Sequence, residues 1–279
     1  MVDIDLEKFF DRVNPDKLMG EVEKRLRDQR VIALIRRYLK AGVLAEGLVG
    51  ASDEGTPQGG PLSPLLSNLL LDQLDRELER RGHRFVRYAD DANLYVKSER
   101  AGKRVMASVS RFLTRKLRLT VNEGKSAVAQ PWERKFLGFT FTAKGKPKRR
   151  VAPQALQRFK ARIRAHTSRT RGISLTRTIR ELRPYLVGWR NYFGFCEVRS
   201  VFKALDSWIR RRLRGMLWKQ WGRRRYRELR ARGVSQDLAW NTLKSAQGPW
   251  RLSRSPALRF ALPAAYFASL GLPRLAEVS

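Results

Sequence analysis

Hydrophobic residues in the first half of this chain change their period from one segment to the next. Leucines between 66 and 78 recur every three or four positions, which predicts a helix that ends near Gly82. Segment 84–96 instead has two short apolar arms, 85–88 and 94–96, and predicts a β-hairpin with Asp90 and Asp91 at its turn. Further strands are expected at 2–6, near 121 and at 136–141, and further helices at 15–27, 31–40 and 105–117. This order predicts an α+β fold, with an antiparallel sheet backed by helices in a split βαβ arrangement.

The second half keeps a helical period throughout. Segment 201–217 places apolar side chains at i, i+3, i+4 and i+7, and a shorter helix is expected over 156–163. Between the halves, AKGKPKRR at 143–150 combines Gly, Pro and charge, which is typical of an exposed connection. We therefore expect two domains, 1–145 with the sheet and an all-helical domain at 146–279.

The net charge is concentrated in the second half. The 279 residues include 59 Lys and Arg against 26 Asp and Glu, a net charge of +33. Residues 1–145 hold 27 basic and 20 acidic residues, whereas residues 146–279 hold 32 and 6. A hydrophobic content of 42% can build a core, so wholesale disorder is excluded. The charge predicts a polyanionic partner, nucleic acid ahead of an anionic membrane.

Cysteine and hydropathy exclude several other classes. With one Cys and two His, the chain can form neither an internal disulfide nor a zinc site of the usual ligands. No run approaches the roughly 18 apolar residues of a membrane span, and Asp3 and Asp5 stand where a secretory signal would be basic. We expect no membrane partner and an intracellular, cytoplasmic location in a bacterium.

Three carboxylates stand at predicted strand ends, namely Asp5, Asp90 and Asp91. Neighbouring carboxylates repel each other unless a cation lies between them, and ligands that are all oxygen favour Mg²⁺. Two such ions can activate a 3′-hydroxyl and stabilise a departing pyrophosphate. The alternative interpretation is that Asp90 and Asp91 are ordinary turn residues and that Asp5 is a solvated surface group.

Three other features have a functional and an ordinary interpretation. Loop 55–64 is rich in Gly and Pro, and Gln58 in it can bond a base or sugar edge, although such loops are commonly plain connections. Aromatic residues of segment 189–195 can stack on RNA bases or lie in the core. A set of arginines can contact RNA phosphates or cover a solvated face. They are Arg190, Arg210, Arg211, Arg212, Arg214, Arg223, Arg224 and Arg225.

Several segments together resemble the successive palm motifs of reverse transcriptases, in that family's order and spacing. They are DIDLEKFFD (3–11), GTPQGGPLSPLLSN (55–68), RYADD (87–91), LTVNEGKS (119–126) and FLGF (136–139). More narrowly, the PQGGPLSPLLSN loop and IRELRPYLVGWRNYFGF (179–195) are similar to bacterial group II intron reverse transcriptase/maturases, whose thumb or X domain carries a GWxNYF signature. Segment 250–275 resembles the C-terminal extension of the same proteins.

The resemblance implies a metal-dependent active site. Asp5, Asp90 and Asp91 match the three catalytic, metal-binding aspartates of the family, and the backbone carbonyl of Leu6 matches an additional ligand. The implied cofactor is a pair of Mg²⁺ ions, and the implied reaction is attack of a primer 3′-hydroxyl on the α-phosphate of a dNTP.

Four more residues take roles from the resemblance. Phe10 matches the aromatic residue that packs under the sugar and discriminates against a 2′-hydroxyl, and Gln58 matches the amide that lies against the templating pair. Lys125 matches the basic residue of the nucleotide site. Gly138 matches the hairpin that grips the primer.

The resemblance therefore implies an RNA-directed DNA polymerase of the group II intron type that also binds intron RNA as a maturase. Its partners would be intron RNA, an RNA template, a DNA primer and dNTPs. In the family a long fingers region precedes the strand of the first catalytic Asp, yet here that strand begins at Val2, so we expect missing fingers. Either another chain supplies them, as in a homodimer or with a separate fingers polypeptide, or the frame is truncated, or activity is weak. The alternatives are a maturase that binds intron RNA without polymerising and a basic RNA-binding protein with a relic palm.

Overall fold

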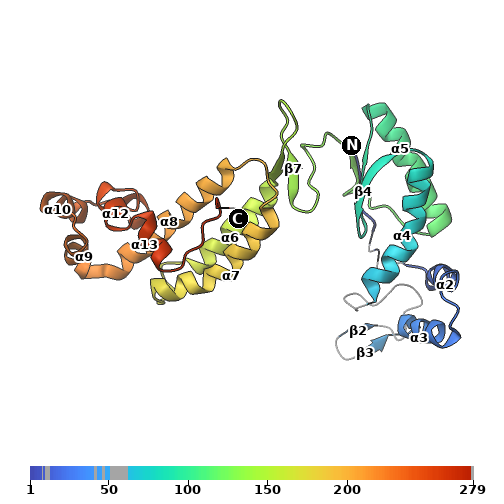
Figure 1. Cartoon of the computed structure of the whole chain (residues 1–279), viewed down its shortest axis with the longest axis horizontal. Coiled ribbons are helices and arrows are strands. Elements are labelled where there is room, and N and C mark those ends of the chain that lie inside the picture. Colours follow the sequence, from blue (N-terminus) through green and yellow to red (C-terminus); the bar gives the residue numbers. More distant parts are fainter. Residues whose placement is uncertain (8, 10–12, 41–42, 46–47, 51–61, 278–279) are drawn as a thin grey trace. The chain divides into compact units, whose positions relative to one another are not determined.

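The computed structural model describes residues 1–7, 9, 13–40, 43–45, 48–50 and 62–277 (Figure 1). It consists of two compact units, Met1–Phe136 and Leu137–Ser279. The boundary expected at residues 145 and 146 falls inside the second unit, in the loop between the paired strands β7 (Phe139–Phe141) and β8 (Arg149–Val151). The basic AKGKPKRR segment is therefore part of a hairpin, because backbone pairing joins the strands on either side of it.

The first unit is built on a four-stranded antiparallel sheet with the strand order β4-β5-β1-β6. Its strands are β1 (Val2–Ile4), β4 (Arg84–Tyr88), β5 (Asp91–Tyr95) and β6 (Ala127–Val128). Strands β4 and β5 form the predicted hairpin, with Ala89 and Asp90 at the turn and Asp91 as the first residue of β5. The sheet and its helices confirm the predicted α+β fold.

Two helices of this unit pack against the sheet, and two more pack on them. The helices are α2 (Pro15–Glu23), α3 (Gln29–Lys40), α4 (Ser63–Arg80) and α5 (Glu99–Phe112), and a π-helical turn at Leu113–Leu117 continues α5. Helix α2 packs against α4, and α3 packs against α2. Helix α4 packs against β4, and α5 packs against β1 and β6 (Figure 1). Asn14 caps α2 as its Asn-Pro pair predicts, because its side chain accepts the N–H of Lys17 at 3.0 Å. A short separate hairpin is formed by β2 (Val43–Ala45) and β3 (Leu48–Gly50).

The two faces of the sheet differ in polarity. Val2, Ile4, Ala92 and Leu94 are fully buried on the face toward the helices. The leucines of α4 that complete this core are Leu66, Leu70, Leu71, Leu74 and Leu78. On α5, a Cβ at Gly102 would lie 2.5 Å from the side chain of Val128, so glycine allows the helix to approach the sheet. Because side chains alternate along a strand, the polar residues between these positions point to the opposite face.

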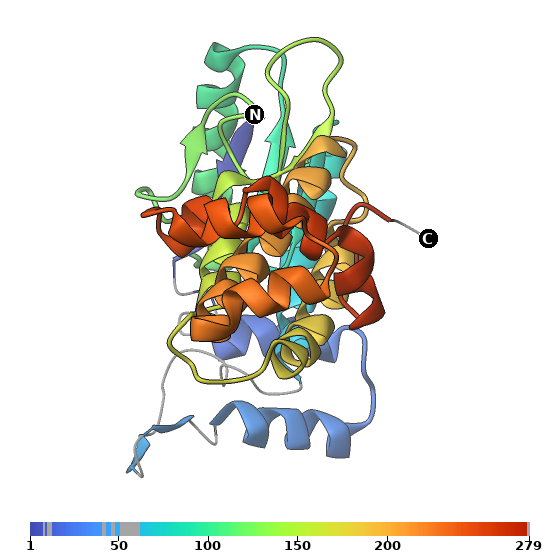
Figure 2. The same ribbon diagram turned by 90° about the vertical axis from the view of Figure 1, so that its left-hand side faces the viewer.

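The second unit is helical apart from the β7–β8 hairpin. A strand of three residues, such as β8, is too short to show a period, so the sequence pattern did not separate it from the helical region. The helices are α6 (Pro153–His166), α7 (Leu175–Phe193), α8 (Ser200–Trp221), α9 (Arg225–Ala231), α10 (Gln236–Lys244), α11 (Pro249–Leu252), α12 (Pro256–Ala261) and α13 (Ala264–Ser269), with a 3₁₀ turn at Gly222–Arg224. The short helices α9 to α13 face the viewer in Figure 2. In the parts of the chain that the structure covers, every helix is too short or too polar to span a bilayer.

Aromatic packing forms the centre of this helical unit. The ring of Trp189 lies 4.5 Å from that of Phe159, 4.7 Å from that of Phe193 and 5.7 Å from that of Phe202, measured between centroids. Trp189 and Phe193 are buried, so the core interpretation holds for them, whereas Tyr192 and Phe195 on the same segment are exposed. The GWxNYF signature therefore contributes both to the core and to the surface.

Candidate active site and nucleic-acid interface

Asp5 and Asp91 lie opposite each other, one position beyond the last paired residues of strands β1 and β5. The last paired residues are Ile4 and Ala92, so the next positions along the two antiparallel strands are Asp5 and Asp91. Opposed residues of an antiparallel pair lie on the same face, here the face opposite the helices. Asp90 precedes Asp91 in the β4–β5 turn. The structure therefore brings the three predicted carboxylates to one end of the sheet.

The electrostatic state of Asp91 reflects this grouping. Burial raises the pKa of Asp91 to about 6, and the negative charges of Asp3, Asp5 and Asp90 contribute to the increase, while Lys135 opposes it. A raised carboxyl pKa means that ionised carboxylates are unfavourable here without a compensating cation. The site therefore favours the binding of positive charge.

Asp3 is a member of this acidic group that sequence reasoning missed. It is buried, and its Oδ2 accepts a hydrogen bond from Arg134 Nε at 2.6 Å. A second nitrogen of Arg134 donates to the carbonyl of Lys125. The signal in the sequence was the alternation of strand β1, which places Asp3 on the same face as Asp5.

The residues fit a divalent cation in chemistry but do not form a chelating group. Among the described residues, no set of three or more His, Cys, Asp or Glu side chains is arranged so that it could hold a metal ion. Asp5 Oδ1 lies 3.6 Å from Lys125 Nζ. The donors are nonetheless all oxygens that repel one another, which is the donor set that Mg²⁺ takes. Leu6, the proposed source of a carbonyl ligand, is buried and bridged to Val121.

The LTVNEGKS motif holds the end of strand β1. The N–H of Asp5 donates to Ser126 Oγ at 3.0 Å, and the carbonyl of Asp5 accepts the N–H of Asn122 at 2.9 Å. Asn122 also accepts the N–H of Lys125 through its side chain at 3.1 Å. These bonds hold Lys125 beside the first carboxylate, and its role in nucleotide binding stays a prediction. Phe10 and Gln58 lie outside the described residues, so their roles stay predictions.

Residues 137–139 of the FLGF turn belong to the helical unit, and helix α7 contacts this turn. Leu137 and Gly138 both have left-handed backbones, with φ values of +50° and +78°. The hydroxyl of Tyr192 donates to the carbonyl of Leu137 at 2.9 Å, and a Cβ at Gly138 would lie 3.2 Å from the ring of Phe193. The Tyr and Phe of the GWxNYF signature therefore hold the turn that carries the predicted primer-grip glycine.

Replacing Gly138 with Ala is expected to lower the free energy of unfolding by about 1–3 kcal/mol, because alanine is strained at this φ and its Cβ crowds Phe193. Gly145→Ala is the matched control, since Gly145 also has a left-handed φ but a Cβ there meets no atom within 4 Å. Thermal unfolding of the two variants measures the difference. Equal losses would show that Phe193 does not constrain the turn.

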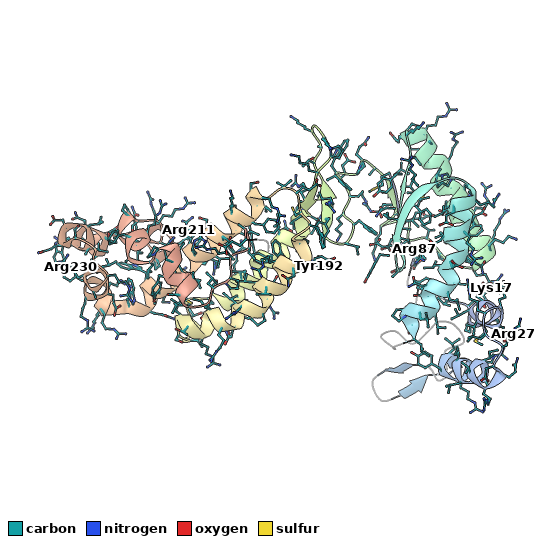
Figure 3. The ribbon with its side chains drawn as sticks, viewed as in Figure 1. Lys17, Arg27, Arg87, Tyr192, Arg211 and Arg230 are labelled. Carbon is teal, nitrogen blue, oxygen red and sulfur yellow. The ribbon has the colours of Figure 1, made fainter. Side chains whose placement is uncertain are left out.

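The predicted RNA-binding arginines divide into two groups. Several donate hydrogen bonds within the helical unit, to backbone carbonyls or to side chains of other helices and loops. At 2.5–3.0 Å, Arg211 donates to the carbonyl of Trp250, Arg212 to Thr167 Oγ1, Arg214 to the carbonyl of Leu262 and Arg225 to the carbonyl of Trp218. Arg190 donates to the carbonyl of Arg274 over a longer distance, 3.4 Å. Arg211, which is labelled in Figure 3, also places its guanidinium carbon 3.7 Å from the centroid of the Trp250 ring. In contrast, Arg223 and Arg224 are exposed, and Arg210 is half-buried.

Two families match successive parts of the chain. Residues 1–141 match the reverse transcriptase (RNA-dependent DNA polymerase) family, and residues 156–233 match the group II intron maturase-specific domain. Since the first match spans half of the chain, this protein belongs to the reverse transcriptase family, and it carries a maturase-specific domain after its palm. Both matches confirm the family predicted from the motifs.

Individual relatives match over shorter segments. Protein YkfC of Escherichia coli (strain K12) is 42% identical over 81 residues, which are 29% of this chain and 21% of that protein. Group II intron-encoded protein LtrA of Lactococcus lactis subsp. cremoris is 39% identical over 75 residues, which are 27% of this chain and 12% of that protein. The alignments thus cover a minor part of either relative. Among solved structures, a telomerase from Candida tropicalis in complex with a telomeric RNA fragment aligns with a TM-score of 0.46 and 13% identity, over 93% of this chain and 44% of that one, a likeness too distant to establish a shared fold by itself.

Proposed function

We propose that the first unit catalyses RNA-templated DNA synthesis and that the second unit binds intron RNA. The observation that supports the polymerase activity most directly is the grouping of Asp5, Asp90 and Asp91 at one end of the sheet of a reverse transcriptase domain. The substrates would be dNTPs, a DNA primer and an RNA template. The structural boundary at Phe136 and the predicted one at residue 145 both leave these carboxylates in the polymerase domain.

The three aspartates, with the carbonyl of Leu6, would hold two Mg²⁺ ions. When bound, Mg²⁺ lowers the pKa of a 3′-hydroxyl and neutralises charge on the departing pyrophosphate. The residues of the chain prepare this step. With a pKa raised to about 6, Asp91 is ionised at neutral pH and takes up a cation favourably. Lys125, beside Asp5, supplies positive charge for the triphosphate of the incoming nucleotide.

Binding of intron RNA by the second unit is supported by its composition and its family match. Residues 146–279 carry 32 basic against 6 acidic residues, and residues 156–233 match the maturase-specific domain. Phosphate neutralisation by such a surface gives strong, salt-dependent binding. A maturase that does not polymerise is the second candidate, and it is favoured by the finding that the described carboxylates do not form a chelating group.

Mg²⁺-dependent dNTP incorporation on a primed RNA template tests this proposal, with the Asp90→Ala/Asp91→Ala protein as control. Incorporation by the chain that is lost in the control would support a self-sufficient polymerase. If the chain binds RNA tightly and incorporates no nucleotide, the polymerase proposal is contradicted and the maturase remains.

A further inference from the structure

Arg87 makes four hydrogen bonds behind the turn that carries Asp90 and Asp91. Its Nε donates to Asp75 Oδ1 at 2.8 Å, and its Nη2 donates to Asp75 Oδ2 at 2.6 Å. Its Nη1 donates to Asn68 Oδ1 at 2.9 Å and to the carbonyl of Ala89 at 2.8 Å. The Arg87 side chain is only 10% exposed. One guanidinium therefore joins strand β4, helix α4 and the β4–β5 turn.

Helix α4 provides a rigid base for these bonds. Asn68 and Asp75 are seven positions apart, which places them on the same face of the helix about two turns from each other. The neighbouring leucines of α4, Leu70, Leu71 and Leu74, are buried in the core, so the helix cannot shift without disrupting it. The planar pair between Arg87 and Asp75 fixes the orientation of the guanidinium as well as its position.

The turn itself needs such support. Ala89 has a φ of +52°, a left-handed conformation that residues with a Cβ rarely adopt. Such conformations persist where the surroundings over-determine them, and they concentrate at functional sites. Here the supporting bond is made by the carbonyl of Ala89, which is joined directly to the backbone nitrogen of Asp90.

We propose that Arg87 is a positioning residue, which anchors the Ala89 carbonyl to Asp75 and Asn68 of helix α4 and thereby presents Asp90 and Asp91 for cation binding. This inference rests on the proposed polymerase function. An ordinary salt bridge would need only the charge of Arg87. A positioning role needs the planar guanidinium with its several N–H donors, because the single ammonium group of a lysine cannot pair bidentately with Asp75 while also reaching Asn68 and Ala89.

The decisive variant is therefore Arg87→Lys, which keeps the positive charge and removes the planar guanidinium. Arg84→Lys is the matched control, because Arg84 lies on the same strand but is exposed. Three quantities are measured: kcat and the KM for dNTP, the dissociation constant of Mn²⁺ by electron paramagnetic resonance, and the melting temperature. We expect Arg87→Lys to lower kcat by about 10- to 100-fold with little change in KM, since a displacement of about 1 Å has an effect of this size.

Mn²⁺ binding separates positioning from a merely structural role. Misplaced carboxylates weaken every site and raise the dissociation constant, whereas partial unfolding lowers the number of sites and leaves the dissociation constant unchanged. We expect a rise of about tenfold in Arg87→Lys, which corresponds to a displacement of the ligands, and none in Arg84→Lys. If Arg87→Lys does not fold, Asn68→Ala, which leaves the pair with Asp75 intact, should show smaller changes in the same direction.

Two outcomes would overturn the positioning role. One is a folded Arg87→Lys protein with the Mn²⁺ affinity and kcat of the wild type, and the other is a wild-type protein that binds no Mn²⁺. Failure of the polymerase proposal is distinguishable from these. A wild-type protein that incorporates no nucleotide but binds Mn²⁺, with weaker binding in Arg87→Lys, would contradict the polymerase and still support the role of Arg87.

Discussion

Replacing Asp91 with Asn is expected to abolish nucleotide incorporation and, in the absence of divalent cations, to stabilise the protein. The loss of activity should be at least about 10³-fold, since one of the three acidic ligands becomes a neutral amide. The gain in stability arises because burial and the charges of Asp3, Asp5 and Asp90 disfavour the ionised carboxylate of Asp91. For a half-buried group, solvent screening limits this gain to the order of 1 kcal/mol.

The sign of the pH dependence follows from the raised pKa. Since the pKa of Asp91 in the folded protein, about 6, lies above the ordinary value of 3.8, the folded state retains the proton to higher pH than the unfolded state. The contribution of Asp91 to stability is therefore complete below about pH 4 and is lost as the pH rises through about 6. The Asp91→Asn protein lacks this dependence, so the difference between the two proteins should be largest above about pH 6.

Thermal unfolding at about pH 5 and about pH 7.5, on either side of the raised pKa, with and without Mg²⁺, measures this difference, and filter binding measures RNA affinity. Asp72→Asn is the matched control, because Asp72 on α4 pairs with Arg25 and Arg76 outside the acidic group. It should retain incorporation and should not be stabilised. Parallel losses of activity and RNA affinity in Asp91→Asn would contradict the division of functions between the two units.

The second large effect is expected from the exposed arginines. The double substitution Arg223→Gln/Arg224→Gln should weaken RNA binding and reduce the dependence of log K on log salt by about 0.7 for each lost phosphate contact with single-stranded RNA. Its melting temperature should stay that of the wild type, because both side chains are exposed. Binding measured at several salt concentrations gives the slope directly.

Arg214→Gln is the contrasting variant. Arg214 donates to the carbonyl of Leu262 at 2.9 Å, and burial, together with the nearby cations Arg210 and Arg259, lowers its pKa to about 10. Its removal leaves that buried carbonyl without this donor and should cost about 1–3 kcal/mol of stability with an unchanged salt slope. If instead Arg214→Gln lowers the slope and Arg223→Gln/Arg224→Gln does not, the division of the arginines into structural and RNA-facing groups is wrong.

The sequence by itself determined the features that depend on neighbours along the chain. The leucine period of α4 predicts a helix, and the two short apolar arms of 84–96 on either side of Asp90 and Asp91 predict a hairpin. The hairpin then places Asp90 and Asp91 at a strand junction, and the ordered motifs indicated the reverse transcriptase family, which the family match confirms.

Only the tertiary structure decided which residues of the same type are held by contacts within the fold and which are exposed. Arg214 and Arg224 are both arginines in the same basic region, yet Arg214 bonds a carbonyl 48 positions away, whereas Arg224 is exposed. Likewise, the guanidinium of Arg87 donates hydrogen bonds to two side chains of α4 and to the carbonyl of Ala89 in the turn. Such partners depend on how elements distant in sequence pack together, and a periodic pattern within one segment contains no information on that packing.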